Sequence, residues 1–548
     1  MIGPTVPAKY SVAMKEGIAS PLKQSLKAAL GVRPGEGRLL LLPLLLFFLK
    51  GISDVFLATS GSTLFLKEFG NASLPKVYIA SAALVTVFGL AYSYLSTRFS
   101  VLALLRATII FSALTIAIFH FSLTFLGSKW WSMGLMMWRE VLYMLLNVTF
   151  WAQAGLFFNV RQSKRLFPLI SAGDIGSAAI GGAAIPFVVK YTGPLHLLFF
   201  AEVSAALCLI VSARLGRVAA SHGSEDIAAD SQPITKLIKD PYVALLMTIS
   251  VVSFVIYFFA DYNFYDVVNN KYQQAESLAA FLGIFYAVLN GFNLVVNFAI
   301  AGRVLNRYGT FAGLLVLPVC VGASTLAAIG FSTFGVGAAI FWSIVIMKLL
   351  DELLRGAFLV PVVKILCQPL PDRVRLRVQA VRDSIVEPFA IGFSGFVLLV
   401  LTRASFQRNQ LLWILLLILA VFVTLGALLR KQYINILRKA LSGTPDTKDV
   451  ETLARGLESR DPNEVIRSFT LIQRANSLAA KIYLPQILKH AVPEVRLYGL
   501  RQIQETREIR AAGLVRSLIE TEQSLSVKSE ALLTLSLLKE EDKDGGSI

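Results

Sequence analysis

Oppositely charged side chains lie four residues apart inside long apolar stretches of this sequence. Lys50 and Asp54 form one such pair, and Lys348 and Glu352 form another. Because residues four apart share one face of a helix, each pair can form an ion pair on that face. A charge at the centre of a lipid bilayer costs about 3 kcal/mol or more, so such side chains normally face a partner or water inside the protein. The pattern predicts a polar passage through a membrane, with ion pairs that open when a substrate enters.

Further charges occur inside these stretches, and together they define a predicted substrate site. Asp351 and Arg355 repeat the four-residue spacing. The residues predicted to bind a substrate are Lys50, Asp54, Glu140, Asp266, Lys348, Glu352 and Arg355. Arg139 and Asp261 are additional candidates. For individual members the alternatives are a long side chain that reaches the membrane surface, or an ion pair with a purely structural role.

A second set of charges lies near the ends of the apolar stretches. Basic clusters around Arg161 and Arg373 each follow an apolar stretch, and acidic residues open the stretch that comes next. Charged hydrogen bonds between such groups can hold two segments together at one membrane face. We predict a gate formed by Arg161, Asp174, Arg373 and Asp383.

The composition is typical of a membrane protein. The chain has 548 residues, of which 55% are hydrophobic and 16% charged, and its mean hydropathy is +0.65. Soluble domains usually carry about 25% charged residues, and a run of about 20 apolar residues matches the thickness of a bilayer. We therefore predict an all-α membrane protein with twelve transmembrane helices in two six-helix halves. The predicted spans are 39–59, 77–97, 101–126, 131–158, 166–189, 193–213, 242–266, 278–301, 311–331, 334–363, 380–402 and 409–429.

The polar segments divide the chain into domains and orient it. The net charge of +17 resides mainly in short loops on one side of the predicted membrane, which places both termini in the cytoplasm. A nucleic-acid partner would instead need a basic patch on a soluble domain. The predicted domains are a cytoplasmic N-terminal tail (1–37), a first six-helix bundle (38–213), a cytoplasmic linker (214–240), a second six-helix bundle (241–430), a helical domain (441–540) and a disordered tail (541–548).

The two predicted halves match at a single offset of 212 residues. The charged residues that match are Asp54 with Asp266, Glu140 with Glu352, and Arg161 with Arg373. They fall at equivalent points of each half. Duplicated six-helix halves are typical of the major facilitator architecture, in which spans 1, 4, 7 and 10 line the central cavity. The predicted substrate-binding residues lie on those four spans.

Three segments carry a resemblance to a known family. They are FFLKGISDVFLATSGSTLFLKEF at 47–69, REVLYMLLNVTFWAQAGLFFNVRQSKRLFPLISAGDIGS at 139–177 and LDELLRGAFLVPVVKILCQPLPDRVRLRVQAVRDSIVEP at 350–388. With the spans around them, residues 38–430 resemble the nucleotide transporters of plastids and intracellular bacteria, the ATP/ADP translocase type. The resemblance implies secondary transport by ATP/ADP exchange across a bacterial inner membrane.

The family's charged residues carry over in part. Its acidic residue at the opening of the fourth span matches Glu140, and that of the seventh span falls near Asp266. The lysine that the family places before the first-span aspartate is Ser53 here, with Lys50 three residues earlier. A different anionic or zwitterionic metabolite is therefore an alternative substrate to ATP or ADP, and proton coupling through the carboxylates is an alternative to exchange.

The segment after the last predicted span contains three similar stretches, DPNEVIRSFTLI, AVPEVRLYGLRQI and SLSVKSEALLTL. Their aligned valines, Val465, Val495 and Val527, are 30 and 32 residues apart. This pattern resembles HEAT repeats, in which pairs of helices stack into a solenoid. Such a domain implies a protein partner, so the alternative function is a membrane-anchored scaffold or sensor. A helical cap that packs under the membrane domain is the other interpretation.

Motifs for enzymatic chemistry are missing from the sequence. It contains no Walker loop, HExxH or GxSxG motif. These motifs are typical of nucleotide-binding proteins, zinc metalloproteases and serine hydrolases, respectively. Cys208, Cys320 and Cys367 have no paired spacing, so neither a disulfide nor a metal site is predicted. We expect no enzymatic activity, no cofactor and no metal. The predicted partners are a small anionic solute, such as ATP or ADP, and the lipid bilayer.

Overall fold

The computed structural model of the chain describes residues 36–158, 160–219, 240–370, 372–441, 454, 456–459, 461–475, 477–506 and 511–544. Residues 1–35 of the predicted N-terminal tail and residues 220–239 of the predicted linker lie outside this range. The described residues are almost entirely helical and contain no strand. They divide into two units, Met1–Arg430 and Lys431–Ile548.

The predicted first half folds into six long helices. They are α2 (Glu36–Phe69), α3 (Leu74–Ser96), α4 (Val101–Phe125), α5 (Trp130–Phe157), α6 (Val160–Thr192) and α7 (Leu197–Ala219), with the short 3₁₀ turn η1 (Asn71–Ser73) between α2 and α3. A helix satisfies its backbone hydrogen bonds internally, as an apolar segment in lipid requires. The apolar stretches therefore become helices, and the short polar breaks become their connections.

The predicted second half contains long helices that π-helical turns interrupt. The long helices are α9 (Pro241–Lys271), α10 (Ala275–Val295), α12 (Thr310–Thr333), α13 (Gly337–Leu354), α16 (Glu387–Arg403) and α17 (Arg408–Leu441). The shorter segments are η2 (Val296–Ala301), α11 (Gly302–Tyr308), η3 (Arg355–Leu359), α14 (Val360–Leu366), α15 (Asp372–Val381) and η4 (Arg382–Val386). Turns of this kind are frequent at functional sites, and η3 begins directly after the charged end of α13.

Ten helices in the described part of the chain are long and apolar enough to cross a membrane. The protein is thus a multi-pass membrane protein, as predicted. The helices α5 and α13 are not among the ten. They carry Arg139 and Glu140, and Lys348, Asp351 and Glu352, respectively, and such charges lower the hydropathy of a helix. The count of twelve spans stays a prediction.

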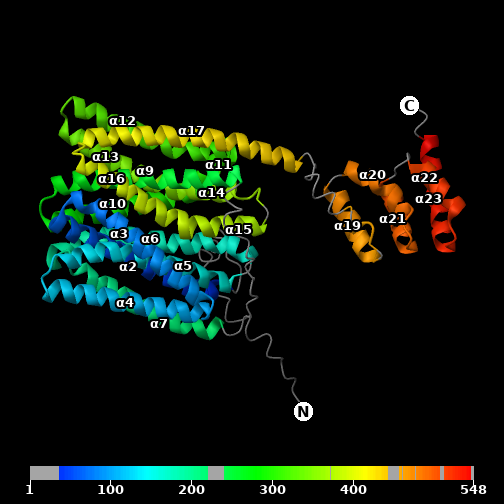
Figure 1. Ribbon diagram of the computed structural model, residues 1–548. Coiled ribbons are helices and arrows are strands. Elements are labelled where there is room, and N and C mark those ends of the chain that lie inside the picture. Colours follow the sequence, from blue (N-terminus) through cyan, green and yellow to red (C-terminus); the bar gives the residue numbers. More distant parts are fainter. Residues whose placement is uncertain are drawn as a thin grey trace, which may run out of the picture. The chain divides into compact units, whose positions relative to one another are not determined.

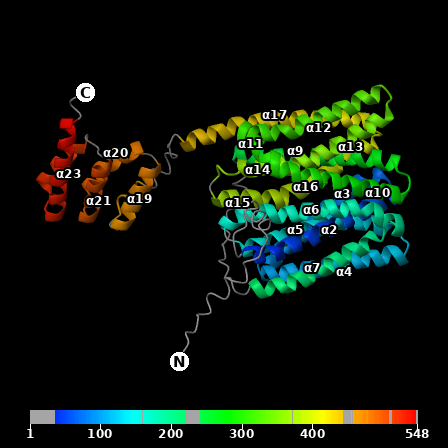
Figure 2. The same cartoon turned by 180° about the vertical axis from the view of Figure 1, so that it is seen from behind.

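The long helices of the first unit lie side by side with their axes roughly parallel (Figure 1). The helices α4 and α7 form one edge, and α12 and α17 form the opposite edge, in the front and back views alike (Figures 1 and 2). The predicted halves meet where α6 packs on α10 and α3 packs on α16. At the first contact a Cβ atom on Gly182 would lie 2.7 Å from the carbonyl oxygen of Gly283. These two backbones are therefore in direct contact.

The described part of the second unit contains five shorter helices after the end of α17. They are α19 (Pro462–Ala475), α20 (Ser477–Leu488), α21 (Pro493–Thr506), α22 (Ala512–Thr521) and α23 (Leu525–Asp544). Val465, Val495 and Val527 lie near the start of α19, α21 and α23, and each is fully buried in a shared core. The three similar stretches of sequence thus occupy equivalent places. Residues 541–544 of the predicted disordered tail are the last turn of α23, and residues 545–548 lie outside the described range.

Candidate functional site

A cavity of about 280 Å³ lies between the two halves of the membrane unit. Its wall is formed by α2, α5 and α6 from the first half and by α9, α10 and α13 from the second. The polar residues on the wall are Asp54, Arg139, Glu140, Tyr143, Tyr257, Tyr286, Asn290 and Glu352. The structure therefore brings three of the predicted site residues, Asp54, Glu140 and Glu352, to one cavity. That they bind a substrate stays a prediction.

Lys50 organises the charges behind the first-half wall, in what we call the Lys50 cluster (Lys50, Asp54 and Asp174). Its Nζ atom lies 2.8 Å from Asp54 Oδ2, one helical turn along α2. It also donates to Asp174 Oδ2 on α6 at 3.2 Å. The lysine is only 2% exposed, so two carboxylates surround one buried cation.

A glycine allows α2 and α6 to approach closely enough for this contact. A Cβ atom on Gly51 would lie 2.5 Å from the carbonyl oxygen of Asp174 and 2.2 Å from Ser177 Oγ. Real Cβ atoms essentially never make contacts this short. The absence of a side chain at Gly51 therefore positions Asp174 beside Lys50.

Lys348 organises the second-half wall in a similar way, in the Lys348 cluster (Lys348, Asp261 and Glu352). Its Nζ atom lies 2.8 Å from Asp261 Oδ1 on α9 and 2.9 Å from Glu352 Oε1, one turn along α13. Tyr78 of α3 donates a hydrogen bond to the other oxygen of Asp261 at 2.6 Å. The Tyr257 ring centroid lies 3.8 Å from the Lys348 nitrogen, which is a favourable position for a cation over an aromatic face.

Two further ion pairs flank these clusters. Arg355 lies 2.7 Å from Asp351 and also donates to the carbonyl oxygen of Ser253 at 2.9 Å. Asp351 is completely buried. Arg139 contacts the neighbouring carboxylate of Glu140 on the cavity wall. The predicted residue Arg355 thus lies one turn beyond the wall residue Glu352.

Asp266 lies outside the cavity, at the end of α9. Its carboxylate accepts hydrogen bonds from Asn71 at 2.7 Å and from Arg408 Nε at 2.6 Å. Nearby, Lys67 at the end of α2 donates to Asn269 at 2.9 Å and to the carbonyl oxygen of Tyr272. These residues connect the first half to the second, and we call them the end latch. The end latch consists of Lys67, Asn71, Asp266, Asn269, Tyr272 and Arg408.

Of the four predicted gate residues, the structure describes the side chains of Asp174 and Asp383. Arg161 lies in the first turn of α6 and Arg373 in the first turn of α15, and their side chains lie outside the described part of the structure. Asp174 belongs to the Lys50 cluster. Asp383 is well exposed and lies 3.1 Å from Arg382. A gate formed by these four residues stays a prediction.

The predicted site residues do not include Tyr143, Tyr286 and Asn290. All three line the cavity. Aromatic and amide side chains are common in membrane helices and carry no charge penalty, so nothing in the sequence marks these three.

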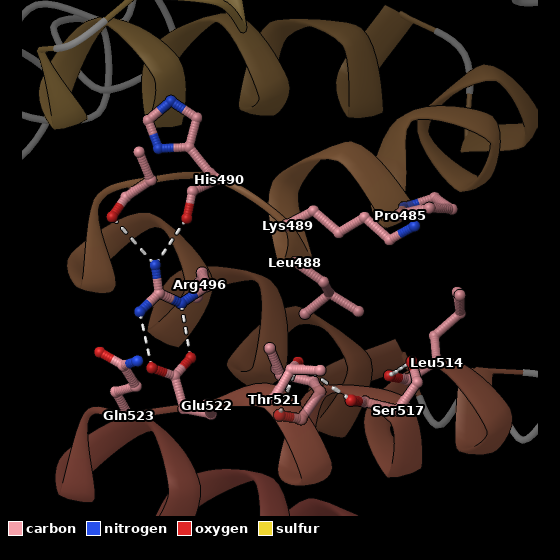
Figure 3. A pocket seen from close by; sticks show the side chains of 12 residues that line it. Pro485, Leu488, Lys489, His490, Arg496, Leu514, Ser517, Thr521, Glu522 and Gln523 are labelled. Carbon is pink, nitrogen blue, oxygen red and sulfur yellow. Dashed lines mark hydrogen bonds and ion pairs between the residues drawn. The ribbon is translucent and has the colours of Figure 1, made fainter.

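A second cavity, of about 370 Å³, lies within the second unit between α20, α21 and α22 (Figure 3). Arg496 forms two hydrogen bonds to the carboxylate of Glu522, at 2.6 and 2.7 Å, and two more to the carbonyl oxygens of His490 and Ala491 (Figure 3). The hydrogen bond from Arg496 lowers the pKa of Glu522 below its usual value. This cavity therefore has a fixed, paired charge at one side and apolar residues such as Leu514 and Leu518 at the other.

Comparison with known proteins gives matches in structure alone. No protein-family model matches the sequence, and no curated protein matches it. A variant of the nucleoside transporter NupG is similar to this chain with a TM-score of 0.50 and 14% sequence identity, over 72% of this chain and 98% of that one. A POT family transporter in complex with a thioalcohol conjugated peptide is similar with a TM-score of 0.52 and 12% identity, over 72% of this chain and 96% of that one.

The predicted major facilitator fold is confirmed by these neighbours. At such low identity the likeness extends to the fold alone. The resemblance to ATP/ADP translocases and to HEAT repeats stays a prediction.

Proposed function

We propose that the membrane unit is a secondary transporter that works by alternating access, and that the cavity between its halves is the substrate site. One observation carries this proposal. Asp54 and Glu140 from the first half and Glu352 from the second meet at the wall of a single cavity. Burying so many ionisable groups within a membrane is costly, and a water-filled path for a polar solute is the usual reason for it. The two solved structures named above as similar are also described as transporters.

The contacts between the halves fit a rocking motion around the cavity. The close approach of Gly182 and Gly283 lets α6 and α10 turn against each other. The end latch holds the halves together at one end through the hydrogen bonds of Asn71 to Asp266 and of Lys67 to Asn269. Opening toward that end requires these contacts to break. The rocking of the two halves then exposes the cavity to each side of the membrane in turn.

The charges around the cavity bear on the class of substrate. The basic residues of the clusters and flanking pairs are Lys50, Arg139, Lys348 and Arg355, and the acidic ones are Asp54, Asp174, Glu140, Asp261, Asp351 and Glu352. The four cations are thus outnumbered by six carboxylates among these residues. A polyphosphate needs cationic partners, whereas the rings of Tyr143, Tyr257 and Tyr286 suit a planar group. We therefore propose a ring-bearing solute of low negative charge, such as a nucleoside, as a candidate substrate in addition to ATP and ADP.

Uptake into proteoliposomes tests the proposal. The purified full chain is reconstituted, and uptake of labelled adenosine, ADP and ATP is measured with and without the same unlabelled solute inside. We expect saturable uptake of at least one of the three, and a loss of about tenfold or more in Glu140→Gln and Glu352→Gln. Glu276→Gln is the matched control, because Glu276 is exposed at the start of α10. Uptake that both cavity variants leave unchanged would remove the cavity from the mechanism.

The placement in the membrane is part of the same proposal. We propose twelve spans, with α5 and the α13–η3–α14 segment crossing the bilayer beside the ten apolar helices, and both termini in the cytoplasm of a bacterium. The charged residues of α5 and α13 lower the hydropathy of these two helices, which are not among the ten. These residues line the cavity or form ion pairs beside it, so they need not contact lipid. Labelling of single cysteines introduced before α2 and after α17 from either side of spheroplasts tests the orientation.

For the second unit we propose a HEAT-like repeat that binds a protein partner, which is the second candidate function. The observation in its favour is the repeat of fully buried valines at equivalent places in α19, α21 and α23. Cross-linking of the full chain in its native membrane, compared with a chain that ends at residue 441, would identify such a partner. An identical cross-linking pattern for both chains would contradict this role.

A further inference from the structure

A further cavity, of about 430 Å³, lies where three helix ends of the second half meet, and we call it the Lys271 cavity. Its wall is formed by Asn270 and Lys271 at the end of α9, by Gly337 and Phe341 at the start of α13, and by Arg408, the first residue of α17. Its volume lies within the range of about 300–1,000 Å³ that is typical of small-ligand sites. The described residues of this wall include two cations and no carboxylate, so the cavity favours an anion.

Lys271 is held at the cavity by aromatic rings. Its Nζ atom lies 3.8 Å from the centroid of the Phe341 ring and 5.6 Å from that of Trp342. A cation over a ring is stabilised by the ring face, but its three N–H donors still need acceptors. Lys271 forms no hydrogen bond or ion pair with any residue in the described part of the chain. Its ammonium group is therefore positioned by the rings and available to an anion.

Arg408 brings a second charge with a free donor. Its Nε atom donates to Asp266 Oδ2 at 2.6 Å, and its Nη2 atom contacts the same oxygen. A guanidinium group has five N–H donors, and Nη1 has no partner among the residues that the structure describes. The Arg408 side chain is 36% exposed. It can thus bind an anion in the cavity while it stays paired with Asp266.

The first turn of α13 adds backbone donors to the same wall. The first N–H groups of a helix have no carbonyl partner within the helix, and the N-cap residue Val336 makes no side-chain hydrogen bond to them. The first bond of this helix runs from the Ile340 N–H to the Val336 carbonyl. The N–H groups of Gly337 and Ala338 precede that bond, and both residues line the cavity. These donors supplement the two cations.

Apolar side chains beside the cavity are exposed. Phe334 and Val336, in the connection between α12 and α13, are 81% and 47% exposed, and Trp342 is 53% exposed. Tryptophan is enriched where membrane helices reach the lipid headgroups. An anion bound in the Lys271 cavity therefore has exposed apolar surface next to it. This combination suits an amphiphile better than a soluble ion.

We propose that the Lys271 cavity binds the phosphate group of an anionic phospholipid. Lys271 and Arg408 form charged hydrogen bonds to the phosphate oxygens, and basic pockets between membrane helices are suited to anionic headgroups. The acyl chains then lie along the exposed apolar side chains. A headgroup with an amine would bring a third cation to the site, so phosphatidylglycerol fits and phosphatidylethanolamine does not. This site is separate from the proposed substrate cavity, and its test requires no transport.

Native mass spectrometry of the purified full chain in detergent tests the site, with phosphatidylglycerol and phosphatidylethanolamine as the probes. We expect the wild type to bind phosphatidylglycerol more tightly, and Lys271→Gln to weaken that binding about fivefold or more, which is the usual contribution of one basic residue near a membrane surface. Lys271→Arg keeps the charge and should retain the affinity. Lys190→Gln is the matched control, because Lys190 is exposed in the last turn of α6 beside the Tyr191 ring and does not line the cavity.

Unchanged affinity for phosphatidylglycerol in Lys271→Gln would overturn the proposal, as would an equal loss in Lys190→Gln. The melting temperature of each variant without lipid checks its folding, and Lys271→Met, which keeps the apolar stem over Phe341, is the second variant. Inorganic phosphate and glycerol phosphate, at the concentration of the lipid, should not displace it. Displacement by either would assign the cavity to a soluble phosphate and would contradict the lipid as its ligand.

Discussion

The Lys50 and Lys348 clusters are built alike on helices that are not equivalent in the internal repeat. In each, a buried lysine contacts an acid one turn further along its own helix and a second acid on another helix. The 212-residue offset relates the first predicted span to the seventh and the fourth to the tenth, yet the lysines lie on α2 and α13, in the first and the tenth predicted spans. The similarity therefore does not follow from duplication. It follows from the need to satisfy a buried cation in a membrane.

The clusters differ in how firmly the second acid is held. Asp174 is 26% exposed in its side chain and lies 3.2 Å from Lys50, whereas Asp261 is 9% exposed and lies 2.8 Å from Lys348. Tyr78 also holds Asp261. The second acid of the Lys348 cluster is thus the more deeply buried, and we expect the balance of charges there to have the larger effect on stability.

Substitution of the two lysines should give the largest loss of stability, and the size of the loss should differ between the two clusters. Lys348→Met leaves Asp261 and Glu352 without their cation, which we expect to lower stability by about 3–5 kcal/mol. Lys50→Met should cost less, because Asp54 and Asp174 can be solvated through their exposed surface. Thermal unfolding of both variants in the same detergent measures the difference. Equal losses would mean that the clusters do not differ in burial.

A methyl group at Gly51 should break the first cluster by steric means. Gly51→Ala pushes α2 away from Asp174 and should cost about 1–3 kcal/mol, as overpacking of a tight contact does. Gly356→Ala in η3 is the matched control, since its Cβ would meet Asn293 at an ordinary 3.7 Å. Thermal unfolding of the pair is the measurement. Tolerance of Gly51→Ala would show that α2 and α6 can separate without loss.

Loss of the Tyr78 hydroxyl should weaken the second cluster alone. Tyr78→Phe removes a hydrogen bond to the charged Asp261, and such bonds contribute about 1.5–3 kcal/mol. Tyr143→Phe near Lys50 keeps the ring that faces the lysine, so its effect should be smaller. The comparison is made by chemical denaturation of both variants. A larger loss for Tyr143→Phe would reverse the assignment of Asp261 as the firmly held acid.

The ion pair between Arg496 and Glu522 gives a reference outside the membrane, with the smallest expected effect. Because Arg496 lowers the pKa of Glu522, the pair stabilises the fold above the ordinary glutamate pKa of about 4.3, and this contribution disappears as the pH falls through the lowered value. Glu522→Gln should speed hydrogen exchange in α21 and α22 at neutral pH but not at about pH 3. An equal effect at both pH values would contradict a charge-based role.

Much of the membrane unit follows from the sequence, because apolar runs between polar breaks dictate helices in lipid. The i to i+4 pairs at Lys50 and Lys348 were also predictable, since both partners lie on one helix. Asp174 beside Lys50 was not, because that contact depends on the packing of α2 on α6 at Gly51. The choice between Asp261 and Asp266 likewise needed the structure.

The case of Asp266 shows why. It matches Asp54 by the repeat, yet α9 extends to Lys271 and carries Asp266 beyond the cavity to Arg408. Asp261 is five residues earlier, more than one helical turn deeper, and contacts Lys348. A sequence offset therefore predicts the position of a residue along its helix only when the ends of that helix are known.

Water access to the cavity is the most direct test of the central claim, which is that the charges surround a shared polar space. Cysteines are introduced singly at Asn290 and Val288 of α10 in a chain whose native cysteines are replaced by serine. Asn290 lines the cavity, whereas Val288 is exposed elsewhere on the helix. A hydrophilic maleimide reacts with thiolate in water, so Asn290→Cys should be labelled in membranes and Val288→Cys should not. Labelling of Val288→Cys with protection of Asn290→Cys would contradict the account.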